Sequence, residues 1–488
     1  MLPRAATPDK DRSALIWLAP PLLYLFTAVV AARRTVADGY DGVGFVLALQ
    51  RLDLARFQPQ PPGYPLFVGL GRLVQALGVP PAVALAVVSA LLLGVGIGAL
   101  AAGVRRWAGP AAGGLSAALL TLAPLSYALG VATLSDGAGL GGLLLAVYAW
   151  GRGGAAAHRL GGVLLGAALG IRPTYAPLAA LLLGGLAVHH GRRALFWASV
   201  SAAGAVLGWL VPFALIVGPR TLWSVIAAHV YGHFTDFGGA VTADRTPGLP
   251  VVALVRGLGQ AALGSAWPLA VVLLLGALRS GPPRSWPAPA RRLVVTLLAG
   301  LAVYLTLALV ALPVRGHARH LLPAVAMLLV VLSVALGAAL AVAGRRARVA
   351  LQLGCALLIG WLALNSARTI WSFRAPTPGA ALAQYVAAHY PRETLLYGGR
   401  AARYLDLYWG SGSARPTLHF GDVLTEAARL DRLPAEVLVT SEVLASAASR
   451  ALLRTVARFC YDPQLPAGLR LDPYADGCVE LRAYRFLP

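Results

Sequence analysis

The sequence predicts an α-helical polytopic membrane protein with about eleven transmembrane helices, followed by a small C-terminal α/β domain outside the membrane. Hydrophobic residues make up 58% of the 488 residues and charged residues 12%, which is too apolar for a soluble chain. Charge also divides unevenly, because residues 1–374 carry 29 basic and 8 acidic groups, whereas residues 375–488 carry 12 and 11. We therefore expect a membrane domain at 1–374 and a soluble domain at 375–488.

Apolar runs of the length that crosses a bilayer, about 20 residues, define the expected spans. They lie at 14–32, 82–104, 110–128, 136–150, 160–174, 175–189, 194–217, 250–278, 293–312, 321–343 and 349–370. Arg33 and Arg34 follow the first run where a cleaved signal peptide would have small residues. We expect this first span to be retained as an anchor.

The basic residues fall in small clusters between alternate spans, as in topology signals of membrane proteins, rather than in one stripe that would bind nucleic acid. The short loops on one side hold Arg105 with Arg106, Arg192 with Arg193, and Arg345 with its neighbours. The positive-inside rule places this side and the N-terminus in the cytoplasm. An odd number of spans then places the C-terminal domain outside a bacterial-type inner (plasma) membrane.

The C-terminal part has a soluble composition and contains all five glutamates. Residues 379–389 read as a helix, and residues 394–397, 436–440 and 479–486 read as strands. Cys460 and Cys478 could form a disulfide if the compartment is oxidising.

Acidic residues are the rarest feature of the membrane domain. It has no glutamate and eight aspartates, and a carboxylate in a bilayer costs several kcal/mol, so each is a candidate for chemistry. On the expected topology Asp38 and Asp41 lie in the first outer loop at 33–80, and Asp136 lies at a short outer turn. Asp236 lies in a later outer loop.

The first outer loop has the most specific sequence. Asp41-Gly-Val-Gly-Phe is followed by Gln60-Pro-Pro-Gly-Tyr-Pro-Leu, whose prolines exclude a regular helix at that point. The short apolar stretch at 66–77 contains two glycines and Arg72, so we expect a helix at the membrane interface rather than a span.

These motifs resemble the first outer loop of integral-membrane glycosyltransferases of the GT-C superfamily, especially the protein O-mannosyltransferase-like branch. Three later segments are also similar to that family: Tyr127 to Asp136, Gly166 to Thr174, and Arg319-His-Leu-Leu-Pro-Ala. The chain departs from the family where Gln60 replaces a histidine and where the glutamate expected near Gly44 is absent. The resemblance implies transfer of a sugar from a polyprenyl-phosphate donor to a hydroxyl of a protein, lipid or glycan acceptor.

Such a transfer needs a base for the acceptor proton and cations for the departing phosphate. We expect Asp41 to be the base, with capping of a helix as the alternative, and Asp136 to orient the acceptor or share the base role, with an N-cap as the alternative. Asp38, Gln60 and Tyr64 are expected to contact substrate.

Four basic side chains are candidates for the donor phosphate. Arg315, Arg319 and His320 lie at the outer entrance of the tenth span, and Arg172 lies at the outer end of the fifth. Contact with anionic membrane lipids is the alternative for the cluster, and snorkelling to the interface is the alternative for Arg172.

The loop after the seventh span contains His229, His233 and Asp236, spaced so that a helix would place them on one face. We expect His233 and Asp236 to contact sugar or acceptor. A divalent metal is conceivable at this spacing, but no third strong ligand is fixed, and no cofactor is assigned.

Two other classes of membrane protein would also have many apolar spans. A lipid-linked glycan flippase or polymerase would also have outer arginines, but would not need the Asp41 loop. A secondary transporter would place ionisable residues near mid-membrane, often in repeated halves, which the sequence does not show.

Overall fold

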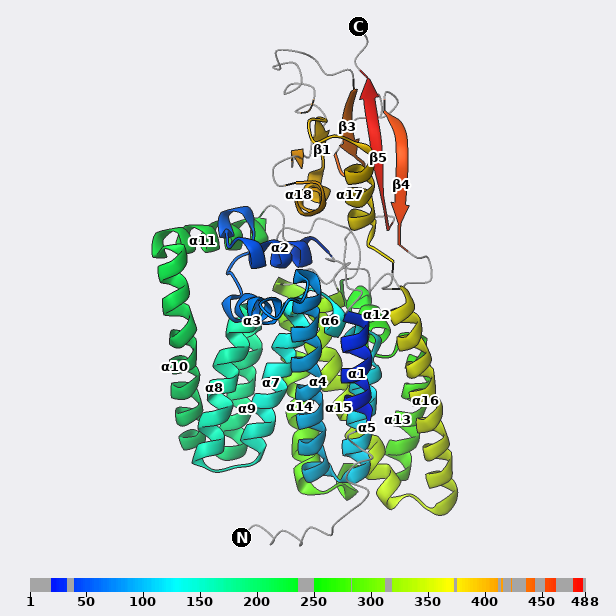
Figure 1. The fold of residues 1–488 in the computed structure, drawn as a ribbon. Coiled ribbons are helices and arrows are strands. Elements are labelled where there is room, and N and C mark those ends of the chain that lie inside the picture. Colours follow the sequence, from blue (N-terminus) through cyan, green and yellow to red (C-terminus); the bar gives the residue numbers. More distant parts are fainter. Residues whose placement is uncertain are drawn as a thin grey trace.

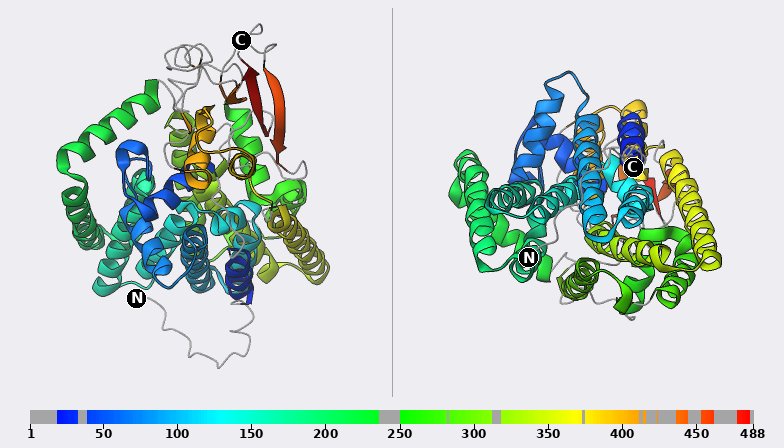
Figure 2. Two further views of the ribbon diagram at one scale, coloured as in Figure 1. Left: turned by 45° about the horizontal axis from the view of Figure 1, so that its top comes forward. Right: turned by 90° about the horizontal axis from the view of Figure 1, so that it is seen from below.

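The computed structural model consists mainly of helices that stand side by side as one bundle, with a small sheet above one end of it (Figure 1). The right-hand view of Figure 2 shows the bundle from below. The residues that the structure describes are 19–32, 39–235, 250–281, 283–311, 318–372, 375–410, 414–415, 423, 436–443, 453–461 and 477–485.

The helices of the bundle follow the apolar runs of the sequence. They are α1 (Ala19–Ala32), α4 (Pro81–Ala108), α5 (Pro110–Leu122), α6 (Pro124–Val131), α7 (Ser135–Gly151), α8 (Ala155–Ile171), α9 (Ala176–His190), α10 (Arg192–Val217), α12 (Pro250–Leu263), α13 (Trp267–Ser280), α14 (Ala288–Ala311), α15 (Leu322–Val342) and α16 (Arg345–Ser372). Within the described ranges, six helices are long and apolar enough to cross a membrane, or seven if one bent pair is a single span. The protein is therefore a membrane protein, while the number of eleven spans stays a prediction.

The span predicted at 110–128 is bent, and its crossing of the membrane stays a prediction. Two helices, α5 and α6, share this stretch and meet at an angle of 58°. Pro124 opens α6, and because proline has no backbone N–H to donate, it cannot continue the hydrogen bonds of α5. The end of α6 lies close to the start of α7, where Asp136 lies.

Glycines allow neighbouring helices to approach closely where large side chains would hold them apart. A Cβ atom on Gly141 of α7 would collide with the backbone oxygen of Leu92 in α4. One on Gly166 of α8 would lie 2.5 Å from the backbone oxygen of Ala202 in α10. A Cβ on Gly142 of α7 would lie 2.9 Å from the Cβ of Ala168 in α8, so α7 and α8 also pack directly against each other.

Helices α2 (Gly39–Gln50), α3 (Pro65–Gln75) and α11 (Pro219–Thr235) lie across the upper end of the bundle (Figure 1). The expected helix at 66–77 is confirmed as α3. Asp41, expected in the first outer loop, lies within the first turn of α2. Between α2 and α3 the chain forms a short 3-10 turn, η2 (Leu54–Arg56), which Asp53 caps by accepting from the backbone N–H of Arg56.

The C-terminal part contains a five-stranded sheet of order β2-β1-β3-β5-β4. Strand β1 pairs in parallel with β2 and β3, and β5 pairs antiparallel with β3 and β4. The elements are α17 (Pro378–His389), β1 (Leu396–Tyr397), α18 (Ala402–Tyr408), β2 (Ala414–Arg415), β3 (Glu436–Thr440), β4 (Arg454–Cys460) and β5 (Cys478–Arg485). The expected helix and three strands are present, whereas β2, β4 and α18 were not predicted.

A disulfide joins Cys460 at the end of β4 to Cys478 at the start of β5, with an S–S distance of 2.10 Å. Their Cα atoms are paired in the sheet register, which brings the two side chains together. The domain boundary at 374 stays a prediction.

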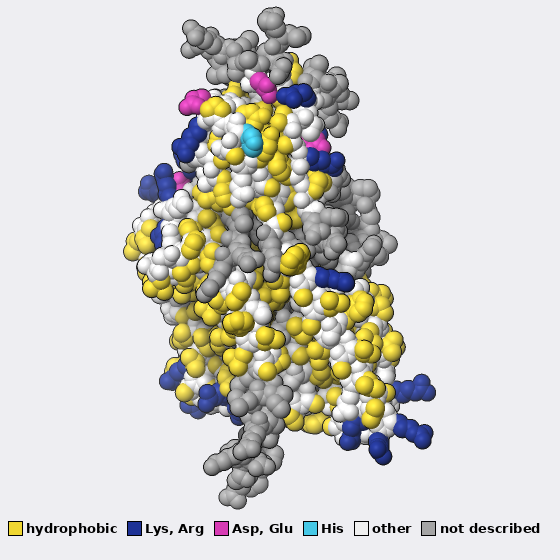
Figure 3. All heavy atoms as spheres, turned by 45° about the vertical axis from the view of Figure 1, so that its right-hand side comes forward, with side chains coloured by type: hydrophobic (Ala, Val, Ile, Leu, Met, Phe, Trp, Pro, Cys, Tyr) yellow, Lys and Arg dark blue, Asp and Glu magenta, His cyan; other side chains and the backbone are white. Residues whose placement is uncertain are grey.

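Side chains of different kinds separate along the long axis of the molecule. Figure 3 shows, on one face, an apolar belt over the helix bundle with only Lys and Arg among the visible charged side chains below it, and with Lys, Arg, Asp and Glu above it. Arg105 and Arg106 end α4, and Arg192 begins α10, on this lower side. Asp41 and Asp136 lie at the opposite, upper end of the helices.

Candidate active site

Asp41 lies at the N-terminus of α2 and forms an ion pair with Arg319. The arginine comes from η6 (Ala318–Leu321), the 3-10 turn that leads into α15. The two side chains are 20% and 19% exposed, so water reaches the pair only in part. A carboxylate in the first turn is also stabilised by the helix dipole. The loop at 33–80 and the entrance of α15 are therefore joined through these two residues.

Asp136 and Arg172 form a second ion pair, at 2.7 Å, and this pair is buried with exposures of 0% and 4%. Asp136 is the second residue of α7, and its carboxylate makes no capping contact, so the alternative that it is an N-cap is wrong. Arg172 also donates to the hydroxyl of Ser135 at 3.0 Å. The hydroxyl of Tyr175 donates to the backbone oxygen of Asp136 at 3.2 Å.

The position of Arg172 follows from the local sequence. Pro173 disfavours helical geometry at the preceding residue, and Arg172 has non-helical backbone angles (φ −141°, ψ 86°) at the end of α8. The chain then turns through η3 (Pro173–Tyr175) into α9, which leaves Arg172 at the upper end of two helices. Gly139 provides space, because a Cβ there would lie 2.7 Å from the Cβ of Arg172. Snorkelling to the membrane surface is therefore not what this buried side chain does.

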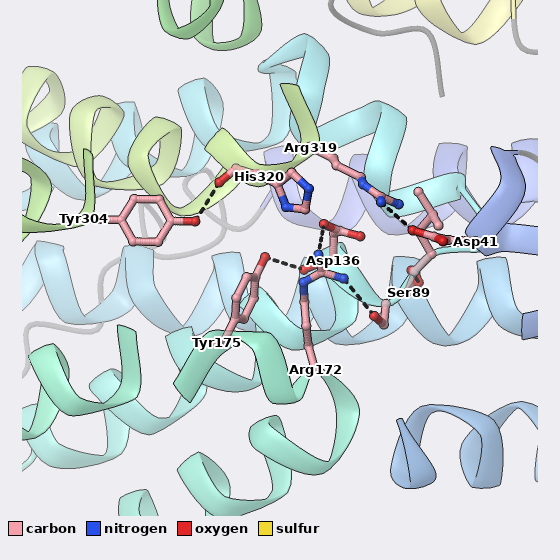
Figure 4. A network of polar contacts seen from close by, with 10 residues as sticks. Asp41, Ser89, Asp136, Arg172, Tyr175, Tyr304, Arg319 and His320 are labelled. Carbon is pink, nitrogen blue, oxygen red and sulfur yellow. Dashed lines mark hydrogen bonds and ion pairs between the residues drawn. The ribbon is translucent and has the colours of Figure 1, made fainter. Parts of the chain in front are cut away.

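The structure brings the two pairs together. Arg319 interacts electrostatically with Asp136 and Arg172 as well as with Asp41. Figure 4 shows the four side chains converging from α2, α7, the end of α8 and the entrance of α15. His320 lies in the same view, and its backbone oxygen accepts from the hydroxyl of Tyr304 at 2.6 Å. The site is thus a cluster of two acids and two arginines at the upper end of the bundle.

Two residues of the proline-rich segment line this region. Tyr64 is buried, its ring packs edge-on against Phe45, and burial raises the pKa of its phenol. The charges of both acids and both arginines of the cluster also act on Tyr64. Gln60 is buried beside Gly44 of α2, and its side-chain oxygen has no hydrogen-bond partner among the described residues. Both therefore lie close to Asp41, and their contact with substrate stays a prediction.

The histidines of α11 differ in position. The ring of His229 lies edge-on to Phe57 of the first outer loop, 5.7 Å between centroids, and its electrostatic partners include Asp41. Burial and the neighbouring charge of His233 lower the pKa of His229. The ring of His233 packs against Phe234. His229 thus faces the first outer loop, and the expected contact of His233 with sugar or acceptor stays a prediction.

Three of the expected site residues, Asp38, Asp236 and Arg315, lie outside the described residues. Within the described part of the chain, no three His, Cys, Asp or Glu side chains are arranged to hold a metal ion.

Sequence reasoning missed several polar residues of the site. Ser135 and Tyr175 adjoin predicted residues, and the Arg172-Pro-Thr-Tyr175 spacing could have indicated the second of them. Tyr304 lies in an apolar span, and Arg403 lies in the C-terminal part, so neither had a local signal. Arg403 contacts the backbone of Tyr40, which is 363 residues away in the chain.

Solved structures of ArnT from Cupriavidus metallidurans are similar to this chain over nearly its whole length. The apo structure aligns with a TM-score of 0.53 and 15% identity, covering 96% of this chain and 97% of ArnT. The structure bound to undecaprenyl phosphate aligns with a TM-score of 0.52 and 15% identity, covering 97% and 98%. At this identity the likeness establishes a shared fold.

An oligosaccharyltransferase from Archaeoglobus fulgidus, solved with a tethered acceptor peptide, aligns less well. Its TM-score is 0.44 at 13% identity, over 86% of this chain and 69% of that one. No protein-family model matches the sequence. No curated protein matches it significantly either.

Proposed function

We propose that this chain, which has the GT-C fold, is a membrane glycosyltransferase that takes its sugar from a polyprenyl-phosphate-linked donor. The GT-C resemblance read from the sequence is confirmed at the level of the fold. In the proposed reaction the sugar passes to an acceptor hydroxyl on the extracytoplasmic side. The protein O-mannosyltransferase-like branch stays a prediction.

The observation that carries this proposal is the pairing of each acid with an arginine in one cluster. A transferase that uses a lipid-phosphate donor needs a proton acceptor and cations within reach of the same bond. Asp41 with Arg319 supplies both, and Asp136 with Arg172 lies beside them. Because the second pair is buried, its geometry is fixed before any substrate arrives.

In the proposed step, the acceptor hydroxyl gives its proton to the carboxylate of Asp41 while its oxygen bonds to the anomeric carbon. The bond from that carbon to the phosphate oxygen breaks, and the electron pair leaves with the polyprenyl phosphate. Sugar therefore moves from phosphate to acceptor, and the proton moves from acceptor to Asp41.

Arg319 has a second task in this proposal. Without donor it is paired with Asp41, and a phosphate group would compete for the same guanidinium, because arginine binds phosphate oxygens through paired donors. When Arg319 turns toward the phosphate, Asp41 loses a positive partner and accepts a proton more readily. Donor binding would thus activate the base.

Asp136 and Arg172 are proposed as the rigid part of the site. Arg172 is held by Asp136 and Ser135, so its remaining donors have a defined direction toward the leaving phosphate. Asp136 then acts chiefly as the partner that fixes Arg172, and it orients the acceptor only if the pair opens. His320, Gln60 and Tyr64 are proposed to line the donor and acceptor positions.

The proposed orientation places the site and the C-terminal sheet outside the cytoplasm of a bacterial-type inner membrane. The basic lower ends of the helices support it through the positive-inside rule. The disulfide between Cys460 and Cys478 supports it too, because disulfides persist in oxidising compartments. A donor bound there would be a membrane lipid, and the similar ArnT structure holds undecaprenyl phosphate.

The test is turnover of defined donors. Purified protein in liposomes is given a panel of polyprenyl-phosphate sugars with hydroxyl acceptors, and release of the lipid phosphate is followed. We expect release from at least one donor, and weaker donor binding after Arg319→Ala. Absence of release from every donor, with lipid-linked glycan moving across the bilayer instead, would favour a flippase.

A further inference from the structure

Arg403, from the C-terminal part of the chain, reaches into the first outer loop. It lies in α18, and its guanidinium donates to the backbone oxygen of Tyr40 at 3.3 Å and to that of Arg56 at 3.4 Å. One contact is at the start of α2 and the other is in η2. A single side chain therefore links the two ends of a segment that has Asp41 near its beginning.

The guanidinium of Arg403 is enclosed by aromatic rings. It lies 3.6 Å from the centre of the Tyr40 ring and 5.2 Å from that of Phe57, and the residue is only 9% exposed. Stacking of this kind favours arginine over lysine, because the planar guanidinium contacts a ring and donates at its edges at once. The contact is built for an arginine.

Gly44, one turn after Tyr40 in α2, completes this enclosure. A Cβ atom at this position would lie 2.8 Å from the backbone oxygen of Phe57 and 3.1 Å from Nη1 of Arg403. Any larger residue would displace the loop backbone or the guanidinium. The close packing of Arg403 against α2 therefore depends on a glycine of the first outer loop as well as on the arginine itself.

Arg403 is itself held by the sheet. A short 3-10 turn, η7 (Gly399–Ala401), joins β1 to α18, and the backbone N–H of Ala401 donates to the carboxylate of Glu442 at 2.8 Å. Thr440 at the end of β3 donates to the backbone oxygen of Gly398 at 3.0 Å. The arginine therefore extends from a fixed base toward the membrane.

The charge of Arg403 also reaches the site. Burial lowers the pKa of its guanidinium, and the negative charge of Asp41 is among the groups that raise it. Arginine remains protonated in proteins, so a fixed positive charge stands near Asp41. The oxygen of Tyr40 that Arg403 binds belongs to the peptide bond that leads into Asp41.

We propose that Arg403 is a positioning residue that fixes the backbone at Asp41, so that the C-terminal part controls the geometry of the site. This inference rests on the proposed function for its effect on turnover. The fixing of the loop itself is independent of the reaction. Without Arg403, the start of α2 and η2 lose their common link, and the carboxylate of Asp41 samples positions that do not suit proton transfer.

Three variants in the full-length protein test this proposal. Arg403→Met keeps length but removes the donors and the charge, and Arg403→Lys keeps the charge but cannot donate to both carbonyls in the same way. Gly44→Ala displaces the guanidinium while the arginine remains. Arg392→Met is the matched control, because Arg392 is an exposed arginine of the same C-terminal part.

The first readout is amide hydrogen exchange of peptides that cover 39–60, in lipid nanodiscs. We expect exchange to be faster by about tenfold in Arg403→Met, since hydrogen bonds to a charged group are lost. Gly44→Ala should behave similarly, Arg403→Lys should be intermediate, and Arg392→Met should match wild type. Unchanged exchange in both Arg403→Met and Gly44→Ala would overturn the proposal.

The second readout separates kcat from KM for the donor. We expect Arg403→Met to lower kcat by about tenfold or more with KM for the donor unchanged, and Arg403→Lys to recover part of the loss. A raised KM with unchanged kcat would overturn the positioning role, since it would make Arg403 a donor-binding residue. If wild type itself releases no lipid phosphate, the proposed function fails, and hydrogen exchange still decides whether Arg403 fixes the loop.

Discussion

Replacing only one partner of the ion pair between Asp136 and Arg172 should destabilise the protein strongly. The two side chains are 0% and 4% exposed and lie 2.7 Å apart, so neither charge can recover hydration when its partner is removed. Arg172→Met leaves a buried carboxylate with no cation at hydrogen-bond distance. Asp136→Asn leaves an arginine that still donates to Ser135 and faces the ring of Tyr175 at 5.1 Å. Arg172→Met should therefore be less stable than Asp136→Asn.

The expected magnitude follows from the cost of an uncompensated buried charge. Removal of one partner of a buried pair costs about 3–5 kcal/mol. We expect Arg172→Met near the upper end of that range and Asp136→Asn near the lower end. The double variant Asp136→Asn with Arg172→Met carries no buried charge, so it should be more stable than Arg172→Met alone.

The assay is equilibrium unfolding in mixed micelles, followed by circular dichroism, for wild type, both single variants and the double variant. The double-mutant cycle gives the coupling energy between the two positions. A double variant whose loss equals the sum of the single losses would refute the reasoning, since it would mean that the charges do not interact. Losses below about 1 kcal/mol in both single variants would refute the burial of the pair.

Three further predictions concern packing, pH and topology. Gly166→Ala should lower the stability in detergent by about 1–3 kcal/mol, because the added methyl group forces α8 away from α10. Gly204→Ala is the control, because a Cβ at this position meets no atom within 4 Å. Equal melting temperatures for the two variants would contradict the close approach of α8 and α10. The pKa of His229 is lowered in the folded state, so near and below pH 6.5 the unfolded state binds more protons, and the free energy of unfolding should fall as the pH drops through that value. His229→Gln should show a smaller fall between about pH 7.5 and 5.5. An equal fall in the variant and in wild type would contradict this prediction. An impermeant maleimide added to intact cells should label Cys460 and Cys478 only after reduction, and labelling that requires permeabilised cells would reverse the orientation.

Most helices of the bundle could be predicted from the sequence, because apolar runs of bilayer length are rare in soluble proteins. The bend between α5 and α6 was not expected, because the run at 110–128 stays apolar through Pro124 and composition alone hides the break. In the C-terminal part, β3 was predicted from its apolar residues, whereas β4 has mostly polar or partly exposed side chains and gave a weak signal.

The site was predicted in part for a physical reason. Carboxylates are costly near a bilayer, so their scarcity pointed to Asp41 and Asp136, and the structure places both in one cluster. Their partners could not be read from spacing, since Asp41 and Arg319 are 278 residues apart and Asp136 and Arg172 lie on different helices. Arg403 and its partner Tyr40 are even further apart in the sequence, at 363 residues, so their contact could not be predicted before the structure was known.

The central claim is that Asp41 takes the acceptor proton, and kcat for lipid-phosphate release tests it most directly. Asp41→Asn removes the base with little change in volume, and Asp53→Asn is the matched control, because Asp53 lies in the same loop and asparagine caps a helix as well as aspartate does. With a donor that wild type uses, we expect kcat to fall by about 10²–10⁴-fold in Asp41→Asn and to stay near wild type in Asp53→Asn. Turnover by Asp41→Asn at the wild-type rate would contradict the account.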